Sequence, residues 1–236
     1  IALASRPDEP DFAPEPFSLL YQRSIYQSMR SLTGRTFQLL RQRLGSLPES
    51  AQAEAEEVLA AQDRLLERFG SLIGGKLSAT RIRTHGDYHL GQVLYTGKDF
   101  VILDFEGEPA RALSERRLKR SPFRDVAGML RSFQYAAHAK LHEEAEAGLV
   151  PAGSLAALET WALDWERWTS AAFLRAYLDR AAGSSFVPSS REELGMLIDV
   201  YLLEKAVYEL AYELNNRPGW VRIPLQGIRQ ILGKGD

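Results

Sequence analysis

Hydrophobic residues recur every three or four positions over most of the chain, which is the spacing of one face of an α-helix. The first such stretch runs from about Phe17 to Gly70 and predicts two or three helices, with breaks near Gly34 and at 45–48. Further helices are predicted at 123–148, 154–182 and 191–216. The last of these ends before Arg217-Pro218-Gly219, which is a helix stop signal.

A different pattern occurs between about Arg81 and Asp104. β-branched and aromatic residues gather there in three short runs, at 81–84, 92–95 and 100–103. The last two runs flank Thr96-Gly97-Lys98-Asp99, a turn signal, and therefore predict a β-hairpin. The expected fold class is mainly α with a small β-hairpin.

The first sixteen residues fit neither pattern. They contain four prolines and four acidic residues, a composition that predicts a linker or interlobe connection, with ordered structure starting near Phe17. Residues 17–236 are expected to form one lobe, divided into 17–80 (helical), 81–110 (loop and hairpin) and 111–236 (helical). The chain begins with Ile1 instead of Met, so we expect it to be a processed product or a piece of a longer polypeptide.

Composition narrows the classes of protein to consider. The 29 Lys and Arg against 31 Asp and Glu leave a net charge of −2, which argues against a generally basic nucleic-acid binder. Cysteine is absent, so disulfides, thiolate metal sites and cysteine nucleophiles are excluded. No run of about 18 apolar residues is present. We therefore expect a cytoplasmic protein without a membrane or nucleic-acid partner.

Polar residues bracket the predicted hairpin. The segment His85-Gly86-Asp87-Tyr88-His89-Leu90-Gly91-Gln92 precedes it, and Asp104-Phe105-Glu106-Gly107-Glu108-Pro109 follows it. The two ends of a hairpin meet, so Asp87 and Gln92 should lie near Asp104 and Glu106. Carboxylate and carboxamide oxygens are hard ligands that suit Mg²⁺.

The spacing of these residues matches a phosphoryl-transfer site. Asp87 and Gln92 are five positions apart, as are the base Asp and the metal-binding Asn of the kinase catalytic loop. Asp104 opens an Asp-Phe-Glu triplet at the place where that pattern puts its main metal ligand. We therefore predict Asp87 as the general base, Gln92 and Asp104 as Mg²⁺ ligands, and Glu106 as a third ligand.

These motifs resemble the kinase-like fold shared by aminoglycoside and choline phosphotransferases, and more closely the maltokinases, including forms fused to trehalose synthase. The similar stretches are 17–34, 84–94, 102–132 and 201–223. Gln92 stands where Asn is usual in the wider superfamily, a departure that favours the maltokinases. The resemblance implies the C-terminal lobe of a protein-kinase-like α+β fold, with ATP and Mg²⁺ as cofactors. A nucleotide-covering loop and a strand Lys are missing before Phe17, so we expect the isolated chain to bind nucleotide poorly and to be inactive.

The resemblance also implies roles for residues around the loop. His85 corresponds to a structural, hydrogen-bonding histidine, and Asp125 to a helix residue that braces the loop backbone. His89 is placed among the substrate-binding candidates. His85 and His89 flank Asp87, so the metal centre of a hydrolase is the alternative interpretation of this segment.

The predicted helix at 191–216 carries two stripes on opposite sides. One is aliphatic, and the other contains Tyr201, Lys205, Tyr208 and Tyr212. Aromatic faces with polar partners suit a disaccharide, so Lys205, Tyr208 and Tyr212 are acceptor-site candidates, with Glu209 and Trp220 behind them. The alternative is a helix buried on both sides. A third stripe, of Trp161, Trp165 and Trp168, is expected to pack in the core, with stacking on sugar rings as the alternative.

The predicted activity is ATP-dependent phosphoryl transfer to the anomeric hydroxyl of maltose, which gives maltose 1-phosphate. The choice of maltose or a similar disaccharide rests on the resemblance. The expected partners are ATP, the sugar, a missing N-terminal kinase lobe and trehalose synthase. Two alternatives remain: a non-catalytic carbohydrate-binding or interaction lobe of a trehalose synthase complex, and a phosphotransferase for another small hydroxylated acceptor.

Overall fold

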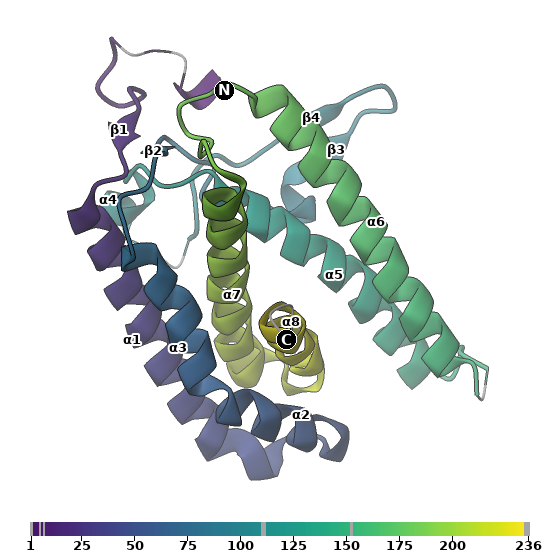
Figure 1. The fold of residues 1–236 in the computed structure, drawn as a ribbon. Coiled ribbons are helices and arrows are strands. Elements are labelled where there is room, and N and C mark those ends of the chain that lie inside the picture. Colours follow the sequence, from purple (N-terminus) through teal and green to yellow (C-terminus); the bar gives the residue numbers. More distant parts are fainter. Residues whose placement is uncertain (1, 5, 7, 110–111, 152, 234–236) are drawn as a thin grey trace. The chain divides into compact units, whose positions relative to one another are not determined.

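The computed structural model describes residues 2–4, 6, 8–109, 112–151 and 153–233 (Figure 1). The chain divides into two compact units. The first unit contains residues 1–16 and 79–187, and the second contains residues 17–78 and 188–236. Residues 1–16 therefore cluster with the segment that bears the hairpin, while their assignment as a connection between lobes stays a prediction.

The first unit is built on two long helices, α5 (Phe123–Glu146) and α6 (Leu155–Ala181), which pack against each other (Figure 1). The short helix α4 (Leu113–Arg116) precedes them. Strands β3 (Val93–Tyr95) and β4 (Phe100–Ile102) form the predicted antiparallel hairpin, in which Leu94 faces Val101. Strands β1 (Glu15–Pro16) and β2 (Thr80–Arg81) form a second small sheet. Ordered structure thus begins before Phe17, contrary to expectation.

The second unit is a helical bundle. Its helices are α1 (Leu19–Arg43), α2 (Glu49–Ala60), α3 (Gln62–Gly70), α7 (Arg191–Asn216) and α8 (Arg222–Leu232). Helix α7 contacts α1, α3 and α8. The aliphatic stripe predicted for this helix is buried, at Leu203, Val207, Leu210 and Leu214. The predicted fold class, mainly helical with small β elements, is therefore confirmed.

Short 3-10 helices complete the chain: η1 (Ala2–Ala4), η2 (Leu44–Ser46), η3 (Ser71–Ile73), η4 (Leu90–Gln92) and η5 (Pro218–Trp220). One expectation about helices was wrong. Gly34 does not break α1, because the helix continues through it. This glycine is exposed, and no atom lies near the position that its Cβ would occupy. Helix α8 lies beyond the stop signal, in the part expected to be helical but without predicted bounds, and its buried residues Leu225, Ile228 and Leu232 show helical spacing.

The tryptophan stripe of α6 lies outside the core, which corrects the expectation of core packing. Trp161 and Trp168 are 73% and 78% exposed. Trp165 is 48% exposed and sets only a ring edge against Phe133, at 6.5 Å between centroids. Helix α6 turns a different stripe towards α5, in which Phe173 contacts Phe133 and Glu166 lies near His138. The sequence of α6 has large apolar residues on more than one side of the helix, so it did not reveal which side would be buried.

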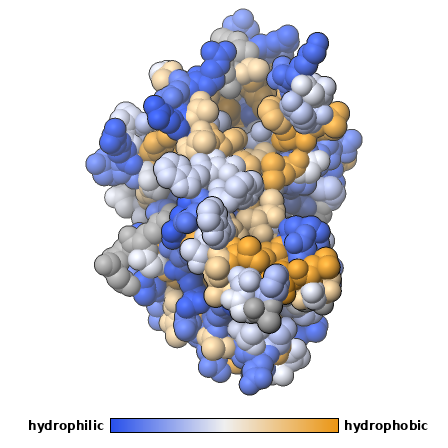
Figure 2. All heavy atoms as spheres, turned by 90° about the vertical axis from the view of Figure 1, so that its right-hand side faces the viewer, coloured by the Kyte–Doolittle hydropathy of each residue, from blue (hydrophilic) through white to orange (hydrophobic). Residues whose placement is uncertain are grey.

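Hydrophobic residues also reach the surface on the side that Figure 2 shows. The exposed apolar residues of the first unit include the hairpin residues Leu94, Tyr95, Phe100 and Val101. No helix in the described part of the chain is both long enough and apolar enough to cross a membrane.

Candidate functional site

The loop at 85–90 rests on the first turns of α5. The Asp125 carboxylate accepts hydrogen bonds from the backbone N–H groups of His85 (2.7 Å) and Gly86 (2.9 Å). Burial raises the pKa of Asp125, while the hydrogen bonds from Gly86 and His85 act in the opposite direction. The carboxylate is thus held in an enclosed place by two loop amides, which is the geometry expected of a residue that supports the loop.

The His85 ring connects this loop to the segment after the hairpin. Its Nε2 lies 2.6 Å from the Leu103 carbonyl oxygen, and its Nδ1 accepts the Asp87 backbone N–H at 3.3 Å. This pattern requires the neutral tautomer with the proton on Nε2. Because both ring nitrogens are engaged, His85 is not available as a metal ligand in this arrangement. The ring also contacts Phe105, at 4.8 Å between centroids.

Two of the three predicted metal ligands, Gln92 and Asp104, meet at the open end of the hairpin. The Gln92 Nε2 donates to Asp104 Oδ2 at 3.0 Å. Their backbones are joined as well, since the Leu103 N–H donates to the Gln92 carbonyl oxygen at 2.9 Å. The hairpin therefore brings together residues that are twelve positions apart, as its register predicts.

Asp104 has an unusual backbone conformation. Its φ of +58° lies in the left-handed region, and it is the one non-glycine residue with positive φ among the described residues. Asp tolerates this region better than most residues, but at a cost in energy. Strained backbone of this kind clusters at functional sites, where the surrounding structure maintains it.

Asp87 lies in the same loop, with its side chain 18% exposed. Its Oδ2 is 3.7 Å from His89 Nε2. The loop touches the segment that follows Asp104: a Cβ on Gly86, whose φ is +90°, would lie 3.1 Å from the Cα of Gly107. The structure therefore places the predicted base and the predicted metal ligands on two adjoining segments.

The side chains near Asp104 decide which kind of cation this place could hold. In the described residues, no group of three His, Asp or Glu side chains is arranged to hold a metal ion. Glu106 is exposed and its role as a ligand stays a prediction. Gln92 and Asp104 nevertheless fit Mg²⁺, which is typically bound by one or two carboxylates together with substrate phosphates and water. Rotation of the Gln92 amide would present its oxygen in place of the N–H group.

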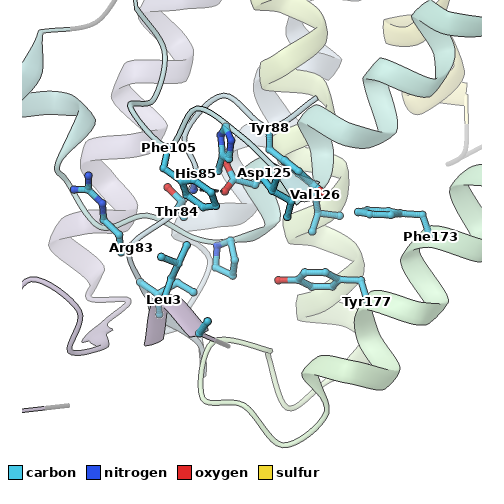
Figure 3. Close-up of a pocket in the computed structure, with 14 residues that line it drawn as sticks. Leu3, Arg83, Thr84, His85, Tyr88, Phe105, Asp125, Val126, Phe173 and Tyr177 are labelled. Atoms are coloured by element: carbon cyan, nitrogen blue, oxygen red, sulfur yellow. Dashed lines mark hydrogen bonds between the residues drawn. The ribbon is translucent and has the colours of Figure 1, made fainter. Parts of the chain in front are cut away.

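A cavity of about 330 Å³ lies behind the loop (Figure 3). Its wall is mostly apolar and includes Phe105, Val126 and Phe173. The Tyr177 hydroxyl points into it (Figure 3), and burial together with the negative charge of Asp125 raises the pKa of Tyr177. The same two causes raise the pKa of Tyr88, another wall residue. Sequence reasoning missed the α6 wall residues, because nothing in the pattern pairs them with the loop.

The acceptor candidates belong to the second unit, on α7 and η5. Lys205 Nζ lies 5.0 Å from the ring centroid of Tyr208. Arg217, which sequence reasoning missed, lies 4.3 Å from the Trp220 ring and 5.4 Å from the Tyr212 ring. Tyr212 is exposed, whereas Glu209 is buried. Apart from Glu209, these residues reach the surface, and the role of the acceptor candidates in binding a sugar stays a prediction.

The buried carboxylate of Glu213 explains why Arg217 holds this position. It accepts two hydrogen bonds from the Arg217 guanidinium, at 2.9 and 2.7 Å. Such bidentate pairs fix the orientation of the guanidinium. Tyr201, the remaining member of the predicted stripe, is buried and is not part of this surface. The pairing of Glu213 with Arg217 could have been predicted from the sequence, because residues four positions apart on a helix lie next to each other.

The chain is a distant homologue of glucosamine kinases. It is 28% identical over 186 residues to the glucosamine kinase of Mycolicibacterium smegmatis (strain ATCC 700084 / mc(2)155), a match that covers 76% of this chain and 41% of the relative. It is 25% identical over 186 residues to the glucosamine kinase of Streptacidiphilus jiangxiensis, covering 76% and 38% respectively. The chain therefore matches about two fifths of the length of these relatives. No protein-family model matches it.

Solved structures show the same fold. A glucosamine kinase in complex with glucosamine, ADP and inorganic phosphate superposes with a TM-score of 0.73 at 21% identity, covering 99% of this chain and 51% of that one. A second crystal form of glucosamine kinase gives a TM-score of 0.73 at 22% identity, with coverages of 99% and 50%. The chain thus has the fold of one half of a glucosamine kinase, as expected for one lobe of a kinase-like enzyme.

Proposed function

We propose that this chain is the acceptor-side lobe of an ATP-dependent sugar kinase. The observation that carries the proposal is the contact between Gln92 and Asp104, at 3.0 Å, beside the loop that bears Asp87. Phosphoryl transfer needs oxygen ligands for a metal ion and a carboxylate that accepts the proton of the attacking hydroxyl. The homology to glucosamine kinases supports the same class of reaction.

Each residue has a defined task in this proposal. Asp87 orients the sugar hydroxyl and accepts its proton. Asp104, assisted by Gln92, holds Mg²⁺, which would neutralise the charge of the phosphates when bound. His85 fixes the loop through its contacts with Leu103 and with the Asp87 N–H. Asp125 anchors the loop to α5.

Maltose, with its anomeric hydroxyl as the nucleophile, is the acceptor we propose from the sequence resemblance. The surface of Lys205, Tyr208 and Tyr212 supports it, because aromatic faces and a charged donor suit a neutral disaccharide. An N-terminal lobe and trehalose synthase stay the proposed partners. Glucosamine is the second candidate acceptor, favoured by the names of the relatives.

The proposal is tested by ³¹P NMR on the protein expressed with the coding sequence upstream of Ile1. Mg²⁺, ATP and either maltose or glucosamine are supplied. We expect ADP together with a phosphorylated sugar, and for maltose a phosphorus signal coupled to the anomeric proton. The Asp104→Asn variant should lose this product, whereas Asp164→Asn, which alters an exposed carboxylate on α6, should retain it. ATP hydrolysis without transfer to any sugar of a wider panel would overturn the proposal.

A further inference from the structure

One side of α5 contacts the loop at three successive places. Asp125, Gly128 and Ser132 are spaced three and seven residues apart, so they share one face of the helix. The Asp125 carboxylate accepts hydrogen bonds from the backbone N–H groups of His85 and Gly86. Gly128 lies against the Tyr88 carbonyl. The Ser132 Oγ accepts a hydrogen bond from the Leu90 N–H at 2.8 Å. The loop therefore runs along the helix and is attached at both of its ends.

The attachment at Ser132 is also the start of η4, which ends at Gln92. The first N–H groups of a helix have no partner within it. In η4 this applies to the Leu90 and Gly91 N–H groups, because the Gln92 N–H makes the first hydrogen bond of the 3-10 helix itself. The Leu90 N–H donates to Ser132, the Gly91 N–H donates to the His89 ring at 3.1 Å, and the Gln92 N–H donates to the His89 carbonyl at 2.9 Å. Ser132 is the only one of these acceptors that lies outside the loop.

This arrangement matters for Gln92. Glutamine has one more rotatable bond than the asparagine usual at this place in kinase catalytic loops, so a fixed backbone is needed to keep its amide beside Asp104. The carbonyl group of Gln92 is held by the segment after the hairpin, because the Leu103 N–H donates to its oxygen. The residues before Gln92 are held by the hydrogen bond from the Leu90 N–H to Ser132, which fixes η4 against α5.

We infer that Ser132 is a positioning residue for the metal ligand Gln92, acting through η4. This inference rests on the proposed function, because it assumes that Gln92 binds a divalent cation. Groups that orient metal ligands without touching the metal commonly contribute 10- to 100-fold to metal affinity. Since Ser132 acts through the backbone and not on the ligand side chain, we expect an effect of about tenfold, at the lower end of that range.

The test uses Mn²⁺ alone as a paramagnetic probe of the full chain, followed by ¹H–¹⁵N NMR. In the wild type, Mn²⁺ should broaden the side-chain amide signal of Gln92 and the backbone signal of Asp104. The Ser132→Ala variant should need about tenfold more Mn²⁺ for equal broadening. Ser132→Thr, which keeps the hydroxyl, should behave like the wild type. Ser170→Ala, which removes a half-buried serine hydroxyl from α6, is the matched control and should leave the titration unchanged.

Hydrogen exchange of the Leu90 amide provides a second readout, which should accelerate in Ser132→Ala and stay slow in Ser132→Thr. If Ser132→Ala fails to fold, Ser132→Cys keeps the shape of the side chain with a weaker acceptor and should give an intermediate titration. Unchanged Mn²⁺ broadening in Ser132→Ala would overturn the inference and leave the proposed function standing. Absence of broadening at both Gln92 and Asp104 in the wild type would instead contradict the metal site of the proposed function.

Discussion

The carbonyl oxygen of Tyr88 lies 2.6 Å from the position that a Cβ on Gly128 would occupy. Real Cβ atoms do not approach an oxygen this closely, so a residue with a side chain would push the loop away from α5. Gly128 is therefore required for the close contact between the loop and the helix. The loop carries Asp87, so this packing bears directly on the candidate site.

We predict opposite effects of alanine at two helical glycines. Gly34→Ala should raise the free energy of unfolding by about 1 kcal/mol, because Gly34 is exposed in α1 with open space around its Cβ position. Gly128→Ala should lower it by about 1–3 kcal/mol, since the clash with Tyr88 outweighs the gain in helix propensity. Urea unfolding of the two variants measures both effects. An increase in stability for Gly128→Ala would show that the loop moves without cost.

The backbone of Asp104 leads to a second prediction. Replacing Asp104 by Gly or by Ala removes the same contact with Gln92, so the difference between the two variants reports on the backbone alone. At a φ of +58° the glycine variant should be more stable than the alanine variant by about 1 kcal/mol. Asp99, in the hairpin turn, is the control, and its φ is not in the positive region. Equal stabilities of the two Asp104 variants in urea unfolding would argue against strain at this residue.

The burial of Asp125 predicts a pH dependence of stability. Its pKa is raised in the folded chain above the ordinary value of 3.8, so the folded state binds the proton more tightly than the unfolded state. The contribution of Asp125 is therefore fully present below pH 3.8 and is lost as the pH rises through the raised pKa. The difference in free energy of unfolding between wild type and Asp125→Asn should decrease over that range. A difference that grows with pH in denaturant titrations would contradict the assigned direction.

The exposure of the α6 tryptophans predicts that they contribute little to stability. Trp161→Ser and Trp168→Ser should change the free energy of unfolding by no more than about 0.5 kcal/mol. Phe133→Ala should cost about 3–5 kcal/mol, because this residue of α5 is buried against α6. Thermal or urea unfolding of the three variants makes the comparison. A loss above about 2 kcal/mol for either tryptophan variant would indicate that the stripe is packed after all.

The local parts of the fold were predictable from the sequence. Helix α7 occurs with the bounds that were predicted, since its apolar spacing is regular and a proline follows it. The hairpin was predictable from its turn residues, and with it the meeting of Gln92 and Asp104. Helix α8 lies in the part expected to be helical, but the sequence analysis gave it no bounds, because the stop signal at Pro218 hides how soon the next helix begins after one 3-10 turn.

Features that depend on packing between distant segments were not predictable. The contacts of Gly128 and Ser132 with the loop join residues about forty positions apart, and a small residue in a helix does not indicate which backbone approaches it. The α6 wall of the cavity and the exposed tryptophan stripe depend in the same way on which face of α6 meets α5. Asp125 was identified only through the resemblance, and its hydrogen bonds to the loop required the structure.

In the proposed reaction, Asp87 accepts the proton of the sugar hydroxyl beside the proposed ligands Gln92 and Asp104. This role is tested by the turnover of the Asp87→Asn variant, combined with the proposed N-terminal lobe, at saturating Mg·ATP and sugar, with nucleotide binding measured in parallel. We expect the rate to fall by about 10²–10⁴ while nucleotide affinity and folding stay unchanged. A variant that keeps more than about a tenth of the wild-type rate would contradict it.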